Sequence, residues 1–303
     1  MHIMRPILEP KNSTPPPTTT QITKIIPPPI GEITIKYASK PTNGPIALEE
    51  ATFIIPVCIE SDDRLMNFKT TYQYLRKTLN TNIIIYECSV EPIIHKLIAD
   101  DVTYIFEKND SPYYHRTRHL NYMLNMVKTP ITVNYDIDVL LKPLTYKLCK
   151  DMIMSGHDIL YPFQFGNFQK QIVYPGRDKI LAGKSLDELS GRDYGSESCL
   201  SYYGHCQFFN TKSYKKYGWE NEHFISYGPE DVERFHRFYL LSDRIDHLNG
   251  HHVYHLEHSR SSNSSNSNPY YIQNYNLLQR IKNMNKSELK NYYHSADYLK
   301  KYE

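Results

Sequence analysis

Residues 132–141, TVNYDIDVLL, carry an apolar, β-branched run directly into two aspartates, Asp136 and Asp138. The run ITVNY predicts a buried strand, and VLL continues the apolar character after the acids. Two like charges at the end of such a strand are costly unless a cation or hydrogen-bond donors lie close to them. A D-x-D pair alone is also common in solvated turns, but the apolar flanks favour a strand end at which a hard divalent cation compensates the carboxylates.

Upstream of this segment, strand-like and helix-like patterns alternate. The strand candidates are ATFIIPVC from Ala51, NIIIYEC and VTYIFEK; the helix candidates are DRLMNFKTTYQYLRKTL, a short piece around PIIHKLIA, and YYHRTRHLNYMLNMV. Such alternation predicts an α/β fold with a mostly parallel sheet flanked by helices. Ligands of open α/β sheets bind beyond the carboxyl ends of the strands. Asp136 and Asp138 therefore fall at the expected binding edge.

The chain divides into an N-terminal arm and one domain. Residues 1–50 contain PPP twice and the run TPPPTTTQ, which predicts a Pro/Thr-rich arm that is partly disordered or packed on the surface. Residues 51–303 are expected to form a single domain. Within it, residues 164–198 carry five glycines and predict an inserted loop, either a lid or a plain surface excursion.

Composition narrows the class of protein. The 35 Lys+Arg residues nearly balance 33 Asp+Glu residues, which gives no field that would favour nucleic acid or an anionic membrane. Five cysteines without CxxC spacing predict free thiols in a reducing compartment. No apolar run approaches the ~18–20 residues of a membrane span, and no signal core precedes the arm. We expect a cytoplasmic protein; its many Tyr, Asn, Ile and Lys residues are typical of an AT-rich genome such as a protist's or a large DNA virus's.

A second feature is the histidine-rich segment 250–258, GHHVYHLEH. If residues 253–258 form one strand, His255 and His258 point to different faces; if the chain turns after Leu256, they can converge on one ion. A zinc site made from these histidines alone is a competing interpretation. His251 and His252 are expected to be bystanders.

A third feature is the segment SYGPEDVERFHR, where Glu230 and Asp231 begin a predicted helix. Acids in a first turn complement the helix dipole, which is sufficient to explain them. The alternative is that one of them is a general base facing the binding edge of the sheet.

Several motifs, in consistent order from about Phe53 to about Asn274, resemble those of inverting glycosyltransferases of the GT-A fold, in particular the β-1,4-galactosyltransferase family and related family-2-like enzymes. They are FIIPVCIESDDRL, YHRTRHLN, NYDIDVLLKP, YYGHCQFF, GPEDVE and HLEHSR. The arginine that the family carries after the first proline is absent, because PVC stands in its place.

This resemblance implies a metal site. Asp138 would be a metal ligand and Asp136 its partner, while His258 would be a second ligand. His255 stands where the family has a methionine ligand, and an imidazole suits Mn²⁺ at least as well as a thioether.

The resemblance also implies roles for five other residues. Arg116 would face the nucleotide-sugar, Tyr202 would line the donor-sugar pocket, and Tyr227 would stack on substrate. Asp231 would be the catalytic base and Glu230 an acid in contact with the acceptor.

The expected activity is therefore metal-dependent transfer of a hexose, galactose first and glucose second, from a UDP-sugar to a glycan or glycosylated acceptor, with Mn²⁺ or another divalent cation. One alternative is a catalytically silent binding protein of the same fold, consistent with the missing arginine. A less favoured one is a zinc hydrolase that uses the His251–His258 cluster.

Overall fold

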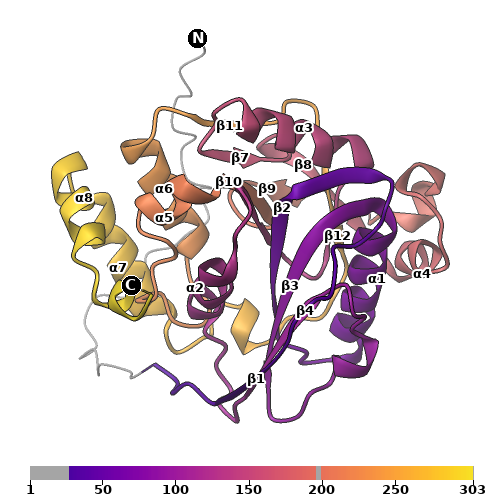
Figure 1. The fold of residues 1–303 in the computed structure, drawn as a ribbon, viewed down its shortest axis with the longest axis horizontal. Helices are drawn as coiled ribbons and strands as arrows, with labels where there is room; N and C mark the ends of the chain where they lie inside the picture. Colours follow the sequence, from indigo (N-terminus) through magenta and orange to yellow (C-terminus); the bar gives the residue numbers. More distant parts are fainter. Residues whose placement is uncertain (1–26, 196–198, 303) are drawn as a thin grey trace.

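The computed structural model of the chain describes residues 27–195 and 199–302, and within them an α/β fold with two sheets (Figure 1). The larger sheet has the order β1-β4-β3-β2-β5-β10-β7-β11. Its strands are β1 (Glu32–Lys36), β2 (Ile46–Val57), β3 (Leu79–Ser89), β4 (Thr103–Lys108), β5 (Ile131–Tyr135), β7 (Ile159–Tyr161), β10 (Cys206–Asn210) and β11 (Ile245–His247). The smaller sheet has the order β6-β12-β8-β9 and consists of β6 (Val139–Leu140), β12 (Val253–Leu256), β8 (Gly166–Ile172) and β9 (Cys199–Ser201).

The predicted strand–helix alternation forms the parallel centre of the large sheet. β4, β3, β2 and β5 pair in parallel, as do β7 and β11, whereas β1 joins β4 and β10 joins both β5 and β7 in antiparallel fashion. All five residues of β5 are buried, as expected for a strand covered on both faces. The predicted mostly parallel, helix-flanked α/β architecture is confirmed.

Helices cover both sides of the large sheet. In Figure 1, α1 and α4 lie on the opposite side from α2 and α5–α8. The α-helices are α1 (Asp62–Thr78), α2 (Arg116–Met126), α3 (Pro143–Met154), α4 (Tyr174–Leu181), α5 (Thr211–Lys216), α6 (Glu230–Leu241), α7 (Tyr271–Lys282) and α8 (Lys286–His294). The 3₁₀ helices are η1 (His95–Leu97), η2 (Leu186–Glu188), η3 (Gly191–Asp193), η4 (Ser262–Ser264) and η5 (Asp297–Lys301). Across residues 27–195 and 199–302, no helix combines the length and apolarity required to cross a bilayer.

An aromatic cluster fills the core at the end of β5, immediately before the two aspartates. The ring of Phe53 lies 5.4 Å from that of Tyr135 and 6.1 Å from those of Tyr146 and Phe208. The hydroxyls of Tyr135 and Tyr146 hydrogen-bond at 2.6 Å. Because Tyr135 is fully buried and immediately precedes Asp136, the core fixes the point at which the D-x-D segment leaves the sheet.

Two expected boundaries change. The boundary at residue 50 falls inside β2, and β1 adds residues 32–36 to the sheet edge; residues 1–26 of the arm lie outside the described residues. The expected loop at residues 164–198 contains β8, α4, η2 and η3, with 196–198 outside the described residues. β8, GNFQKQI, was not recognisable as a strand because it is mostly polar; its pairing with β12 and β9 forms it.

Candidate functional site

The D-x-D segment links the two sheets. β5 of the large sheet ends at Tyr135, and β6 of the small sheet begins at Val139. β6 pairs with β12, which places Val139 opposite His255, and the amide of Leu256 donates to the carbonyl of Asp138 at 2.8 Å. The end of β12 is therefore held beside Asp138.

Asp138, His255 and His258 form a cluster with metal-binding geometry. One ligand atom from each lies within 4.8 Å of the others. Nε2 of His258 is 3.1 Å from Oδ2 of Asp138, and Nε2 of His255 is 3.8 Å from Oδ1. Because β12 ends at Leu256, the chain turns and both imidazoles converge, as the second interpretation of this segment required. One oxygen and two nitrogen donors suit Mn²⁺ and similar first-row cations.

The ionisation of two members of the cluster fits metal binding. Burial lowers the pKa of His255 to about 4, so its imidazole is neutral at pH 7. Burial opposes ionisation of Asp138, but His255, His258 and Arg64 outweigh it and lower the pKa of this carboxyl. The third, His258, has a raised pKa, because its hydrogen bond with Asp138 outweighs burial, so a metal would have to displace its proton. Nδ1 of His258 contacts the carbonyl of Ser259 at 2.7 Å, which directs Nε2 toward Asp138. Such a second contact is typical of metal-ligating histidines.

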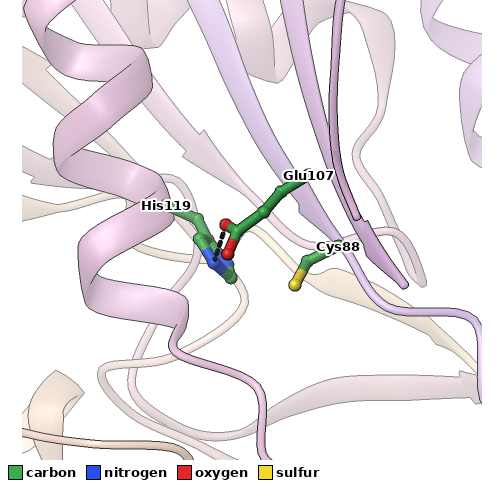
Figure 2. Close-up of side chains that lie close together, drawn as sticks. All are labelled: Cys88, Glu107 and His119. Atoms are coloured by element: carbon green, nitrogen blue, oxygen red, sulfur yellow. Dashed lines mark ion pairs between the residues drawn. The ribbon is translucent and has the colours of Figure 1, made fainter. Parts of the chain in front are cut away.

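A second cluster, Cys88, Glu107 and His119, has similar spacing but a different character. Figure 2 shows the imidazole of His119 against the carboxylate of Glu107, with Cys88 nearby; Nε2 of His119 is 3.2 Å from Oε2 of Glu107. The oxygens of Glu107 also accept from the Gly31 amide (2.9 Å), the Tyr86 hydroxyl (2.7 Å), Asn109 Nδ2 (2.8 Å) and Arg118 Nη2 (3.3 Å). With its lone pairs engaged and a guanidinium present, Glu107 is a structural acceptor and not a candidate metal ligand.

Asp136 has a different partner from Asp138. Nη2 of Arg116, the first residue of α2, lies 2.5 Å from Oδ1 of Asp136. The two carboxylates of the D-x-D pair thus have separate partners: Asp136 has the guanidinium of Arg116, and Asp138 has His258, His255 and the guanidinium of Arg64. Nη1 of Arg116 lies 4.0 Å from Oε1 of Glu230, so Arg116 joins Asp136 to the acid pair on α6.

Glu230 and Arg116 each present an unsatisfied polar atom. Oε2 of Glu230 and Nη1 of Arg116 are buried without a hydrogen-bond partner among the described residues. Burial, and then the charge of Asp231, raise the pKa of Glu230 to about 8 despite Arg116. Glu230 is therefore mostly protonated at pH 7 and can donate a hydrogen bond, whereas Arg116 keeps its charge. Buried polar atoms without protein partners at such a place are suited to a polar ligand.

Asp231, the second residue of α6, is more open. Its side chain is 32% exposed, and its Oδ1 lies 2.5 Å from Nη1 of Arg234. Its Oδ2 would lie 3.1 Å from a Cβ placed on Gly204. The second carboxylate oxygen thus borders the β9–β10 connection.

The two tyrosines lie outside the metal cluster. Tyr202 is half-buried, with ring centroids of Phe165 and Tyr203 at 6.4 and 6.0 Å. Tyr227 stacks on Tyr271 at 6.2 Å, and burial raises its pKa. In the described part of the chain, neither ring makes a hydrogen bond, ion pair or ring contact with the three candidate ligands.

The four histidines of segment 250–258 do not form one site. Nδ1 of His251 lies 3.0 Å from Oγ1 of Thr145, and the ring of His252 lies 5.0 Å from that of Phe168. Only His255 and His258 approach Asp138, so the geometry does not support a zinc site built from this segment alone.

Sequence reasoning missed Arg64 and His205. Nη1 of Arg64, in the first turn of α1, lies 3.6 Å from Oδ2 of Asp138; it supplies a guanidinium near the cluster although the motif arginine after the first proline is absent. The ring of His205 lies 5.5 Å from that of His255, and its backbone adopts φ 70°. Its carbonyl accepts from the Asp136 amide at 3.1 Å. A histidine in a left-handed conformation is uncommon, but the sequence carries no signal for it beyond the preceding glycine.

No protein-family model matches the chain, and no curated protein matches it. Solved structures are similar to it at low identity. A mutant of Drosophila β-1,4-galactosyltransferase 7 in complex with manganese, UDP-Gal and xylobiose aligns over 66% of this chain and 65% of its own, slightly under two thirds, at 11% identity and a TM-score of 0.37. S. aureus TarS, residues 1–349, aligns over 80% of this chain and 68% of its own at 15% identity and a TM-score of 0.44. The TarS complex with UDP-GlcNAc aligns over 80% and 69% at 14% identity and a TM-score of 0.47.

Proposed function

We propose that this chain is a metal-dependent inverting glycosyltransferase that moves a hexose from a UDP-sugar to a hydroxyl of a glycan acceptor. The observation that carries the proposal is the convergence of Asp138, His255 and His258 at the end of β5, next to the acid pair that begins α6. A metal site at the carboxyl edge of an α/β sheet is where a nucleotide ligand is expected.

The donor would be held by charge. Asp138, His255 and His258 would hold Mn²⁺, which when bound neutralises the developing charge on the departing diphosphate. The guanidinium of Arg64, 3.6 Å from Asp138, can pair with a phosphate oxygen, since planar guanidinium groups suit such anions. Arg116 has one Nη atom without a protein partner, which can donate to the nucleotide-sugar.

The acceptor would be activated by the acid pair on α6. Asp231 would take the proton of the acceptor hydroxyl, while that oxygen bonds to the anomeric carbon on the face opposite UDP and the carbon–phosphate-oxygen bond breaks. Glu230, protonated at pH 7 because of its raised pKa, can donate a hydrogen bond to a neighbouring acceptor oxygen. A general base is effective when its proton-accepting atom is within hydrogen-bond reach.

The donor sugar is proposed from Tyr202. In the family that the motifs resemble, a bulky tyrosine at the matching place leaves little room for an N-acetyl group. UDP-galactose is therefore the first candidate and UDP-glucose the second. A donor screen with Mn²⁺ in which UDP-N-acetylglucosamine is turned over fastest would overturn this assignment.

The test of the reaction is Asp231→Asn. We expect UDP release from UDP-galactose, with a glycan panel as acceptors, to fall by roughly 10²–10⁴-fold, the usual contribution of a general base, while calorimetric UDP/Mn²⁺ affinity stays unchanged. The control is Glu288→Gln, which removes a first-turn acid from α8; it should lower stability by about 0.3–1 kcal/mol and leave turnover intact.

Three outcomes separate the alternatives. Near wild-type turnover in Asp231→Asn would make Asp231 a structural acid. Binding of UDP and Mn²⁺ by a wild-type chain that releases no UDP would indicate a catalytically silent binding protein. Hydrolytic activity that needs no nucleotide would favour the zinc hydrolase.

A further inference from the structure

Two arginines of α6 form buried pairs with glutamates. Arg234 binds Glu220 through Nε (2.7 Å) and Nη2 (2.6 Å), and Arg237 binds Glu233 through Nε (2.9 Å) and Nη2 (3.3 Å). Each of these four side chains is at most 1% exposed. Both pairs are therefore fully desolvated, so either is equally costly to break.

The pairs differ in the third contact of the arginine. Nη1 of Arg237 donates to the backbone carbonyls of Tyr217 and Trp219, at 2.7 and 2.6 Å. Nη1 of Arg234 instead lies 2.5 Å from Oδ1 of Asp231. The Arg237–Glu233 pair is therefore linked to backbone carbonyls, whereas the Arg234–Glu220 pair is linked to the proposed base, Asp231.

The guanidinium of Arg234 is held by Glu220, which other residues hold in turn. The backbone N–H and C=O of Glu220 bond the side-chain amide of Asn121 on α2, at 2.8 and 2.9 Å. Its carboxylate also accepts from the hydroxyl of Tyr214, which in turn accepts from Asn134 Nδ2 on β5 at 2.7 Å. Glu220 is thus anchored to a helix and to the central sheet, and it orients the plane of the guanidinium.

This arrangement makes the two oxygens of Asp231 unequal. Oδ1 is bound by Arg234, whereas Oδ2 faces Gly204, where a Cβ would come within 3.1 Å of it. We propose that Arg234, held by Glu220, is a positioning residue that fixes Asp231 so that Oδ2 takes the acceptor proton. The inference rests on the proposed function and extends it, because it assigns the reacting oxygen and the residue that directs it.

A guanidinium suits this task better than an ammonium group. Two of its N–H groups can bind one carboxylate while a third N–H group binds a second carboxylate, all in one plane. The ammonium group of a lysine is instead a compact point charge. Holding Oδ2 of Asp231 in one place matters because a displacement of about 1 Å can cost 10²-fold in rate.

The experiment compares matched double variants, each of which removes both charges of one pair. These are Glu220→Gln with Arg234→Gln, and Glu233→Gln with Arg237→Gln. Melting temperature, calorimetric UDP/Mn²⁺ affinity and UDP release from UDP-galactose are measured for each. We expect both to melt lower and to keep UDP affinity, but only the first to lose roughly 10–10²-fold in kcat, with the KM for UDP-galactose unchanged.

Arg234→Lys is the second variant, in case the first does not fold. It retains the positive charge but not the planar guanidinium, so kcat should fall while the KM for UDP-galactose and the UDP/Mn²⁺ affinity stay at wild-type values. Wild-type kcat in Arg234→Lys, or equal losses of kcat in the two double variants, would overturn the inference.

Asp231→Asn, assayed in parallel, separates this inference from the proposed function. Lost turnover in Asp231→Asn with unaffected turnover in the Arg234 variants would refute positioning alone. A wild-type chain that releases UDP from no UDP-sugar would overturn the proposed function, and the inference with it.

Discussion

At the scale of single residues, the decisive contact is that between Nε2 of His258 and Oδ2 of Asp138, at 3.1 Å. We expect His258→Ala and Asp138→Asn each to abolish the Mn²⁺-dependent part of UDP binding, because each removes one of three converging ligands. Both residues follow the ends of strands, so the fold should survive. The measurement is calorimetry of UDP with and without Mn²⁺.

The matched control for this prediction is His251→Ala. His251 belongs to the same histidine-rich segment, but its Nδ1 contacts Thr145, so its removal should leave Mn²⁺-dependent affinity unchanged. Unaltered UDP affinity in His258→Ala would show that the cluster does not bind the metal.

Some residues of the candidate site could be predicted from the sequence and others could not. The difference lies in what brings each residue to the site. The D-x-D pair and the histidine-rich segment stand out by local pattern, but the resemblance of their motifs to a family was needed to choose Asp138 and His258 within them. Arg64 lies at an ordinary polar position of a helix, and only tertiary packing brings it to Asp138. Arg234 follows Asp231 by three residues on α6, so the helix itself brings the two together, but the burial of Arg234 against Glu220 comes from tertiary packing. Glu107 was not recognised as a buried acceptor either, since an acid in VTYIFEK reads as the polar phase of a strand although it is fully buried.

At the scale of elements, α7 holds the loop that precedes α6. The fully buried Asn274 donates to the carbonyls of Ile225 and Tyr227 at 2.7 and 2.9 Å, and accepts from the Ile225 amide at 3.2 Å. A Cβ on Gly228 would lie 2.5 Å from Asn274 Nδ2, so the loop can approach the amide this closely only with glycine there. Asn274 therefore sets the path of the chain into Glu230.

We expect Asn274→Ala to destabilise the protein by about 1–3 kcal/mol, because it leaves buried backbone groups unsatisfied. It should also reduce UDP release from UDP-galactose, since the loop then places Tyr227 and the acid pair less accurately. Urea unfolding and the turnover assay measure the two effects. Asn276→Ala, an exposed asparagine on the same helix, should change neither, and equal behaviour of the two variants would contradict this role.

Elements were predictable where their apolar period was strong. β2, β3 and β5 overlap the segments that the pattern assigned to strands, because their buried positions are mostly apolar. α6 was indicated instead by the acids of its first turn, since most of its buried residues are charged. β8 was not predicted, since the burial of its residues alternates weakly and comes from its partner strands. Within the small sheet, β12 falls on the segment VYHLEH that the sequence offered as a strand, whereas β8 and its pairing with β12 could not be derived from local pattern.

At the scale of the whole molecule, the site lies where the two sheets meet. β5 delivers Asp136 and Asp138 from the large sheet, β12 delivers the imidazoles from the small sheet, and α6 delivers the acid pair. The candidate metal ligands and the proposed base thus come from separate substructures joined by the D-x-D segment and Arg116. The surrounding core stabilises the placement of these parts relative to one another.

The edge of the large sheet gives the last prediction. The carbonyl of Pro28 accepts from Arg118 Nη1 at 2.6 Å, that of Pro29 from Asn109 Nδ2 at 2.9 Å, and the Gly31 amide donates to Glu107. Gly31 is required there, because a Cβ would lie 1.7 Å from the carbonyl oxygen of Lys108. This segment and β1 are therefore part of the folded domain and not a detachable arm.

Deletion of residues 1–38 should lower the free energy of unfolding by more than about 1–3 kcal/mol, because it removes β1 and leaves several buried polar groups without partners. Gly31→Ala should destabilise through the clash alone. Deletion of residues 1–26 is the control: it removes none of these contacts and should leave urea unfolding unchanged. Because the edge strand lies on the far side of β4, β3 and β2 from β5, UDP/Mn²⁺ affinity at low temperature should persist in all three variants. Equal stability of the two deletions would show that β1 contributes nothing, and lost UDP affinity in Gly31→Ala would show that the edge and the site are coupled.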